Sequence, residues 1–375
     1  MYKEQEHLTF NNTINLGSFY TPQHIVNIVF DMLNKHINNI ENYFIVDTSC
    51  GYGSFLQLNK TIGADIDADA LKVAQKNNPN AKYYCHNSLS NIDRMSYGLT
   101  EQDKIIIVGN PPYNDKTSII RNEIKHIDFK IDNDLKARDL GISFILSYQK
   151  LKADYVCVLH PLSYLLKKTN FDNLRSFKYN YILKDALVIS SGEFSKTSKT
   201  TQFPIVIALY EKNDWGMKYD FICNWNFRTI EKKQFKINQF DYIVNYITKY
   251  PNKQNVLLED TIAYFWTMRD INALKRTKTF IEKENTHTIR ITKDKFPYYC
   301  YIDVFKNYIK HIPYYFGNSD VFIAHNYFMD MQDLFVKQSC SKYSFIRNNN
   351  SDISGNDLNR IDIYFRDLLG EHYVD

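Results

Sequence analysis

The sequence has few glycines, no Cys-x-x-Cys pair and no long apolar run. Its six cysteines are widely spaced along the chain: Cys50, Cys85, Cys157, Cys223, Cys300 and Cys340. This spacing argues against a structural zinc site and against a disulfide framework, and it fits a reducing compartment. The histidines show no metal-ligand spacing, so we expect no bound metal.

Signals for membrane insertion or secretion are also lacking. No stretch reaches the ~18 apolar residues that a membrane-spanning helix requires. Residues 1–10 are charged and polar and contain no secretory apolar core. We therefore expect a cytoplasmic protein with no membrane partner.

Net charge is small, but it is unevenly distributed. The value of +4 does not by itself indicate a polyanionic partner. Residues 216–350 nevertheless contain 20 Lys and Arg against 13 Asp and Glu, whereas the last 25 residues contain two against six. The basic region permits contacts with phosphate groups.

The length of 375 residues favours two domains over one. Short apolar segments predict strands at 43–47, 62–67, 81–86, 105–109, 155–159, 186–189 and 203–210. Helical apolar spacing, as in 142–151, alternates with them, which predicts an α/β domain with a doubly wound, mostly parallel sheet. The pattern changes after Tyr210, and 213–216 is typical of a junction. We expect one domain over 1–212 and a second, α+β domain over 217–375.

Two features of the first predicted strands indicate a nucleotide ligand. The first strand leads into a loop with Gly51 and Gly53, which allow the backbone to approach a ligand closely. The second ends at Asp65, whose carboxylate can accept both hydroxyls of a ribose. The third glycine of the dinucleotide pattern is missing, so a ligand with a ribose and no pyrophosphate fits better, and S-adenosylmethionine is such a ligand. Solvated charge at the strand end is the alternative reading of Asp65 and Asp67.

The tetrapeptide Asn110-Pro111-Pro112-Tyr113 directly follows the apolar run 105–109. It places an amide oxygen, a constrained backbone carbonyl and an aromatic face at the carboxyl end of a strand, where open α/β sheets bind ligands. This set suits an exocyclic amino group on a flat ring, because it offers two acceptors and a stacking surface. Consecutive prolines can also form a plain rigid turn.

Residues 19–212 resemble the amino-type DNA methyltransferases, in particular the gamma class, whose target-recognition domain is C-terminal. The resemblance rests on five motifs in the family's order, at 17–22, 47–55, 63–67, 109–113 and 192–194. It implies the S-adenosylmethionine-dependent methyltransferase fold, with that compound as cofactor. It also implies methylation of N6 of an adenine flipped out of a short recognition sequence in double-stranded DNA. A restriction endonuclease that acts separately is the partner that such enzymes imply.

The resemblance carries twelve cofactor contacts over to this chain. They are Phe19, Tyr20, Thr21, Asp47, Cys50, Gly51, Gly53, Asp65, Ile66, Asn87, Ser88 and Asn110. Asp65 resembles the carboxylate that holds the ribose, with Asp67 as a substitute. Asn87 stands where the family usually has an aspartate, and its carbonyl can still accept from an adenine amino group. Cys50, judged from its own residue type, is interpreted as a small packing residue.

The catalytic residues implied by the resemblance are Asn110, Pro111, Pro112, Tyr113 and Phe194. Asn110 and the carbonyl of Pro111 are expected to accept hydrogen bonds from the target amino group, and Tyr113 to stack on the base. Phe194 is expected to support the base, with Phe203 as the alternative. Core packing is the other interpretation of Phe194.

Other substrates share this pocket, namely adenine in RNA and the glutamine amide of translation release factors. In the enzymes that methylate this glutamine, a helical N-terminal domain precedes a catalytic domain that ends near the C-terminus. Here only 46 residues precede Asp47 and about 160 follow Lys212, which favours adenine. The alternative that the chain is a catalytically inactive DNA-binding subunit is disfavoured, because such a protein would not need Asn110 and Tyr113 to bind an amino group.

The second half of the chain is less informative. Apolar spacing over 262–274 predicts a helix, and the basic cluster 275–278 follows it. Aromatic stretches at 296–299 and 312–316 could stack on bases, although core packing explains most tyrosines of so tyrosine-rich a chain. Its position after the catalytic motifs makes this region the expected reader of the DNA sequence.

Overall fold

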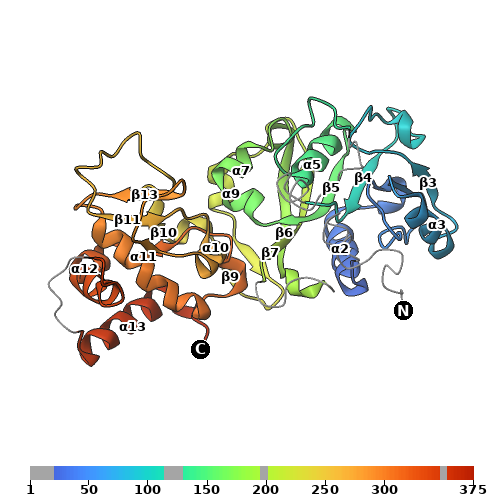
Figure 1. Cartoon of the computed structure of the whole chain (residues 1–375). Coiled ribbons are helices and arrows are strands. Elements are labelled where there is room, and N and C mark those ends of the chain that lie inside the picture. Colours follow the sequence, from blue (N-terminus) through green and yellow to red (C-terminus); the bar gives the residue numbers. More distant parts are fainter. Residues whose placement is uncertain (1–20, 114–129, 195–201, 347–352) are drawn as a thin grey trace. The chain divides into compact units, whose positions relative to one another are not determined.

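In a computed structural model, the structure describes residues 21–113, 130–194, 202–346 and 353–375. The chain divides into two compact units, with the boundary in sequence between Phe235 and Lys236 (Figure 1). This boundary lies later than the expected junction at 213–216, because two further short strands join the first sheet. Phe19 and Tyr20, which were expected to contact the cofactor, lie outside the described residues.

The first unit is built on a nine-stranded sheet with the order β3-β2-β1-β4-β5-β7-β6-β8-β9. Its strands are β1 (Phe44–Asp47), β2 (Thr61–Asp65), β3 (Lys82–Cys85), β4 (Ile105–Gly109), β5 (Tyr155–Pro161), β6 (Tyr181–Ser190), β7 (Pro204–Lys212), β8 (Phe227–Thr229) and β9 (Gln234–Phe235). Strands β1 to β5 pair in parallel, and β7 runs antiparallel between β5 and β6. The predicted α/β class with a doubly wound, mostly parallel sheet is confirmed.

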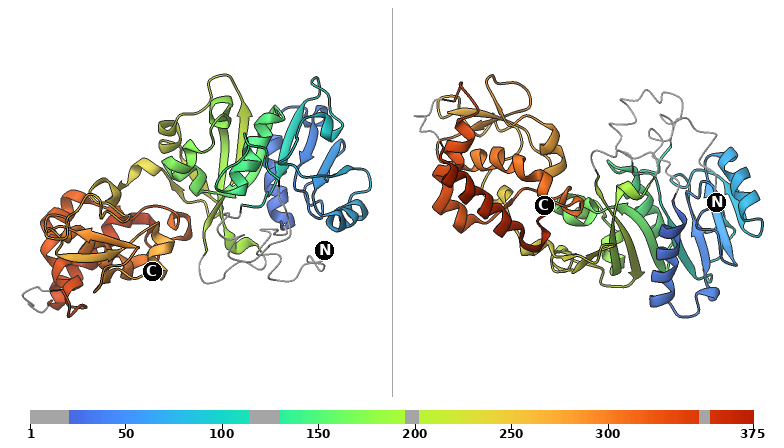
Figure 2. Two further views of the ribbon diagram at one scale, coloured as in Figure 1. Left: turned by 45° about the horizontal axis from the view of Figure 1, so that its top comes forward. Right: turned by 90° about the horizontal axis from the view of Figure 1, so that it is seen from below.

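Helices on both sides of the sheet explain its buried strands. In the first unit they are α2 (Gln23–His36), α3 (Ala68–Asn77), α5 (Leu140–Lys150), α6 (Ser163–Leu166), α7 (Lys168–Asp172), α8 (Phe177–Asn180) and α9 (Tyr219–Cys223). Helix α2 runs alongside the sheet (Figure 2). Its residues Ile25, Val29 and Leu33 share one core with buried residues of β4, β5 and β7. Every residue of β4 is buried, as expected for a central parallel strand.

The carboxylate of Asp185 on β6 connects α2 with β8 through hydrogen bonds. Asp185 is 6% exposed and accepts hydrogen bonds from Lys35 at 3.0 Å, His36 at 2.7 Å and Arg228 at 2.6 Å. Although burial opposes ionisation, the hydrogen bonds from His36, Lys35 and Arg228 and the Arg228 charge lower the pKa of Asp185 to about 2. The carboxylate lies at an irregularity in the pairing of β6 with β7, between Leu183 and Asp185.

The second unit has the predicted α+β composition. It contains a two-stranded sheet of β10 (Asp241–Tyr242) and β14 (Phe322–Ile323), and a three-stranded antiparallel sheet of β12 (Phe280–Ile281), β11 (Ala263–Trp266) and β13 (Thr288–Ile291). Its helices are α10 (Ile271–Arg276), α11 (Phe296–Tyr308), α12 (His325–Cys340) and α13 (Gly355–Leu369). Phe265 and Phe280 of the larger sheet pack against Tyr299 and Phe296 of α11.

The helix predicted over 262–274 is wrong in its first half. Ala263–Trp266 forms the central strand β11, and the helix α10 begins only at Ile271. Aromatic residues favour strands, and Phe265 is fully buried against α11 while its neighbours Tyr264 and Trp266 are half-buried. Asp270 then caps α10 by accepting from the Ala273 N–H at 2.9 Å.

No helix among the described ranges is long and apolar enough to cross a membrane.

Candidate functional site

The candidate site lies where the strand order reverses, at the carboxyl ends of β1 and β4. Strand β1 pairs with β2 on one side and β4 on the other, and the chain continues from β1 into the loop with Gly51 and Gly53. Ligands of doubly wound sheets bind in the crevice at such a reversal. The structure thus brings together Asp47, Asp65 and Asn110, which the sequence places far apart.

Asn110 directly follows β4 and presents a carboxamide to this crevice. Its Nδ2 donates a hydrogen bond to Thr21 Oγ1 at 3.3 Å, and Thr21 is itself only 4% exposed. Its Oδ1 is buried and accepts no hydrogen bond from any described residue. A buried acceptor without a donor costs free energy, so this oxygen is suited to an N–H group of a ligand.

Asp47 ends β1 and is almost fully buried. Its Oδ1 accepts the Ser49 N–H at 3.1 Å. Burial, opposed by this hydrogen bond and reinforced by the nearby Asp65 charge, raises the pKa of Asp47 to about 8. Gly109 passes close to this carboxylate with φ of +147°, and a Cβ there would lie 2.8 Å from Asp47 Oδ1. Only glycine therefore lets β4 end beside Asp47 without displacing the carboxylate.

The glycine loop is fixed by hydrogen bonds on both sides. The Gly51 N–H donates to Asp65 Oδ2 at 2.8 Å, and the Asp67 N–H donates to Asp65 Oδ1 at 2.9 Å. Each carboxylate oxygen of Asp65 retains a second acceptor site. Gly51 and Gly53 adopt φ of +50° and +79°, and Asn78 Nδ2 donates to the Gly53 carbonyl at 3.0 Å. Burial raises the pKa of Asp65 despite the two hydrogen bonds.

Asp67 and Ile66 have different surroundings, although they are neighbours. The Asp67 carboxylate caps α3 by accepting from the N–H groups of Asp69 and Ala70 at 2.9 Å and 3.1 Å. Ile66 is 48% exposed beside the Asp65 carboxylate. Asp65 is therefore better placed than Asp67 for a ligand, and Ile66 offers it an apolar surface.

Three other residues expected at the cofactor have partners within the protein. Ser88 Oγ donates to the Thr48 carbonyl at 2.6 Å. Asn87 donates through Nδ2 to the Lys130 carbonyl at 2.7 Å and accepts from the Leu89 N–H at 3.0 Å. Cys50 is 6% exposed and packs with Leu56 and Leu71. These side chains shape the loops of the site, and the Cys50 contacts match its interpretation as a packing residue.

Ser49 is a site residue that the sequence motifs did not single out. Its Oγ is buried in the loop after β1 and has no hydrogen-bond partner among the described residues. Its position two residues after Asp47 was the only available signal, because serine is common in loops. Among the described residues, the loop after β1 and the end of β4 thus contain three buried oxygens without a hydrogen-bond partner, namely Thr48 Oγ1, Ser49 Oγ and Asn110 Oδ1.

Tyr113 is braced from behind by the start of α5. It packs against the core of the first unit, and a Cβ on Gly141 would lie 2.9 Å from Tyr113 Cβ. Asp139 caps α5 by accepting the Gly141 N–H at 2.9 Å and also accepts the Tyr164 hydroxyl hydrogen. Burial raises the pKa of Tyr113, so its ring stays neutral at physiological pH. Pro111 is buried and Pro112 half-buried between Asn110 and this ring.

Phe194 is 3% exposed and belongs to the core cluster that α2 forms with the sheet. Phe203, the alternative, is partly buried against the same cluster. This placement supports core packing for Phe194, and a contact with a base stays a prediction. In the parts of the chain that the structure describes, no group of three or more His, Cys, Asp or Glu could hold a metal ion.

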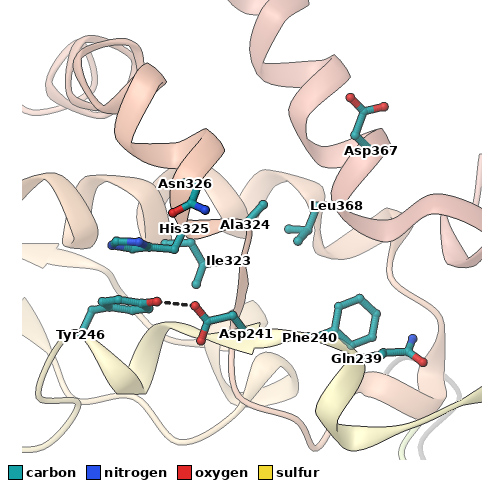
Figure 3. A pocket seen from close by; sticks show the side chains of 10 residues that line it. All are labelled: Gln239, Phe240, Asp241, Tyr246, Ile323, Ala324, His325, Asn326, Asp367 and Leu368. Carbon is teal, nitrogen blue, oxygen red and sulfur yellow. Dashed lines mark hydrogen bonds between the residues drawn. The ribbon is translucent and has the colours of Figure 1, made fainter.

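The second unit contains a cavity of its own, of about 570 Å³. It is lined by Gln239, Phe240, Asp241, Tyr246, Ile323, Ala324, His325, Asn326, Asp367 and Leu368 (Figure 3). The rings of Tyr246 and His325 stack 4.1 Å apart, and the Tyr246 hydroxyl donates to Asp241. Because Asp241 and Asp367 line it, this cavity carries negative charge.

Comparison with known proteins finds similarity in the part of the chain that forms most of the first unit. Residues 6–170 match the model of the N-6 DNA Methylase family. The matched segment includes the loops that follow β1, β2 and β4. A search among curated proteins gave no match.

Among solved structures, the chain is similar to three whose descriptions concern methylation or DNA. The methyltransferase subunit of a type I restriction-modification system from Streptococcus thermophilus has 17% identity and a TM-score of 0.40, over 60% of this chain and 48% of that one. A methyltransferase from Anabaena variabilis that depends on S-adenosylmethionine has 13% identity and a TM-score of 0.33, over 54% and 92%. DrdV in complex with DNA has 14% identity and a TM-score of 0.35, over 58% and 28%.

The family match supports methyl transfer as the reaction and S-adenosylmethionine as the cofactor. The residues at the strand-order reversal fit that cofactor on their own chemistry. Asp65 offers acceptors suited to ribose hydroxyls, Asp47 offers a buried carboxyl group, and Ser49 Oγ has no hydrogen-bond partner in the described part of the chain.

Proposed function

We propose that the chain transfers a methyl group from S-adenosylmethionine to N6 of adenine in a short sequence of double-stranded DNA. The observation that carries the proposal is the buried Oδ1 of Asn110 at the end of β4, which has no hydrogen-bond donor among the described residues. An exocyclic amino group has two N–H donors and would satisfy this oxygen. Most buried side-chain acceptors of native proteins have a partner, so this oxygen is a candidate acceptor for a ligand N–H.

The residues that would hold the cofactor surround the glycine loop. Asp65 would accept from the ribose, Ile66 would pack on the adenine, and Asp47 would lie near the methionine end with Thr21. When bound, S-adenosylmethionine supplies a methyl group on a sulfonium, which is a good leaving group. No covalent nucleophile of the protein is needed, so we assign the protein's contribution to positioning and electrostatics.

Asn110 and Pro111 would orient the acceptor nitrogen. Nδ2 of Asn110 donates to the Thr21 hydroxyl at 3.3 Å, which leaves Oδ1 as the end of the carboxamide available to a ligand N–H. Oδ1 and the Pro111 carbonyl would then accept the two N–H bonds of the target amino group. Both hydrogen bonds raise electron density on the nitrogen and direct its lone pair toward the methyl group, and Tyr113 would stack on the base.

An adenine inside a duplex cannot reach this buried group, so the base would have to be flipped out. We assign sequence recognition to residues 217–375, most of which form the second unit. An enzyme with this activity would protect DNA from a restriction endonuclease that acts as a separate protein.

The test is a methyl-transfer assay of the purified chain with labelled S-adenosylmethionine. Mixed-sequence duplex DNA, the same sequence as RNA, and a release-factor protein with a glutamine acceptor are offered separately. Label in N6-methyladenine of DNA, absent with Asn110→Ala, is the expected result. Label in RNA alone or in the glutamine amide alone would contradict the proposal.

A further inference from the structure

One end of the three-stranded sheet in the second unit gathers basic and aromatic side chains. Trp266 ends β11, Lys278 comes just before β12, and His287 comes just before β13. Arg276 and Lys275 end the neighbouring helix α10. We call these five residues the basic–aromatic end.

Hydrogen bonds of the backbone bring these residues to the same place. The Trp266 N–H donates to the Thr279 carbonyl at 2.8 Å, so Lys278 lies in the segment next to Trp266. The Thr267 N–H donates to the His287 carbonyl at 2.9 Å. The rings of Trp266 and His287 lie 5.2 Å apart, with Trp266 half-buried and His287 exposed.

The three cations of this end are available to a ligand. Lys275, Arg276 and Lys278 are exposed, and none has a hydrogen-bond or ion-pair partner among the described residues. Glu284, a carboxylate of the β12–β13 connection, is paired with Arg290 at 2.7 Å and with Lys253 at 3.7 Å. The helix dipole of α10 accounts for basic residues in its last turn, but not for Lys278, which lies beyond the helix.

Charge argues for a polyanion at this end of the unit. Unpaired Lys and Arg side chains beside an indole ring are what a sugar–phosphate backbone requires, with cations for phosphates and an aromatic face for sugar or base. The cavity of the second unit is a poor alternative, because Asp241 and Asp367 line it and would repel phosphate.

We propose that the basic–aromatic end binds the backbone of the DNA substrate. Lys275, Arg276 and Lys278 contact phosphates, and the Trp266 ring packs on an adjoining sugar or base. This inference rests on the proposed function, because it assigns the contact to the same DNA that is methylated.

The first test measures how salt weakens duplex DNA binding by the full chain and by the variant Arg276→Gln/Lys278→Gln. Each phosphate contact contributes about 0.9 to the slope of log K against log salt. Loss of two contacts therefore lowers the slope by about 1.8 and weakens binding on the order of 60-fold at 0.1 M salt. The KM for DNA should rise correspondingly, while S-adenosylmethionine affinity stays unchanged.

The matched control is Lys310→Gln/Arg360→Gln, which removes one lysine and one arginine from exposed positions elsewhere in the second unit. For this control, the slope of log K against log salt should equal the wild-type slope, apart from the small change that the lower net charge causes. A slope lowered equally by both variants would refute the contact at the basic–aromatic end. So would an unchanged slope in the Arg276/Lys278 variant.

The second test removes the ring with Trp266→Ala, with Trp215→Ala as control, since Trp215 is 80% exposed in the first unit. Trp266→Ala should weaken DNA binding roughly tenfold without changing the salt slope, because stacking is not electrostatic. Thermal unfolding shows whether the Trp266→Ala chain is folded. If it is not, Trp266→Phe is tested instead and should retain most of the wild-type affinity for DNA. Wild-type affinity in a folded Trp266→Ala chain would contradict the ring contact.

Failure of this inference is distinguishable from failure of the proposed function. If the wild-type chain methylates DNA, but the Arg276/Lys278 variant has the same salt slope as the Lys310/Arg360 control, only the inference about the basic–aromatic end is refuted. If the wild type methylates no DNA, the proposed function falls and the inference with it. Tighter binding to an RNA duplex, with the slope change seen only there, would overturn the assignment to DNA.

Discussion

Gly109 and Asp47 end adjacent parallel strands so closely that a Cβ on Gly109 would lie 2.8 Å from Asp47 Oδ1. The close approach places the buried carboxyl group of β1 against Gly109, the residue that directly precedes Asn110. The glycine before Asn110 therefore helps to define the site, although it carries no side chain.

Gly109→Ala should weaken S-adenosylmethionine binding and destabilise the first unit. The new methyl group must displace the Asp47 carboxylate, and the φ of +147° disfavours any side chain. We expect a loss of about 1–3 kcal/mol in the free energy of unfolding, measured by denaturant titration. Gly355→Ala is the control, because no heavy atom lies within 4 Å of its added Cβ. Equal stability of the two variants would argue against the close approach.

Asn110→Ala should lower turnover while cofactor affinity stays nearly constant. The substitution removes a preorganised acceptor for the reacting amino group, which typically costs ~3 kcal/mol, or roughly a hundredfold in kcat. Calorimetric titration gives the cofactor affinity and a single-turnover assay gives the rate. Thr21→Val should also lower the rate, because Asn110 Nδ2 loses its acceptor. Wild-type turnover in Asn110→Ala would exclude the assigned role.

Asp47 should make the free protein less stable as the pH rises. Its pKa is raised to about 8, whereas an unfolded aspartate titrates near 3.8. Between these values the folded state retains a proton that the unfolded state has lost, so stability decreases with pH. The contribution is fully present below about pH 4 and is lost by about pH 8. Asp47→Asn should lack this slope in unfolding experiments from pH 5 to pH 8, and an equal slope in both proteins would contradict the assignment.

Asp185 should have the opposite pH dependence. Its pKa is lowered to about 2 by Lys35, His36 and Arg228, so its stabilisation is present above about pH 4 and is lost as the pH falls toward 2. Asp185→Asn should cost about 2 kcal/mol at neutral pH, since charge-assisted hydrogen bonds are replaced by weaker ones. Acid unfolding of wild type and variant, compared side by side, checks this, and parallel acid transitions would count against it.

The sequence predicted best those elements whose pattern is local. Strand β4 was predicted at 105–109 and is Ile105–Gly109, because a fully apolar run is typical of a central parallel strand. Strand β6 was predicted only at 186–189 and extends over Tyr181–Ser190. Its polar Lys184 and Asp185 interrupt the apolar run, and their partners on other elements are invisible in the sequence.

For the candidate site too, the residues with a local sequence signal were predicted and the long-range contacts were not. Asp47, Asp65 and Asn110 were expected at the cofactor, because each lies near or just after the end of a predicted parallel strand and such strands end at one edge of the sheet. The hydrogen bond between Tyr164 and Asp139, which caps the helix that packs behind Tyr113, was not expected. Those two residues lie 25 positions apart, and only tertiary packing brings them together.

The most direct test of the central claim is to express the chain in a bacterial host without DNA methylation and to sequence the host DNA by a modification-sensitive method. N6-methyladenine at one recurring short motif, absent when Asn110→Ala replaces the wild type, is the predicted result. Unmodified DNA from cells that contain folded protein able to bind S-adenosylmethionine would contradict the claim.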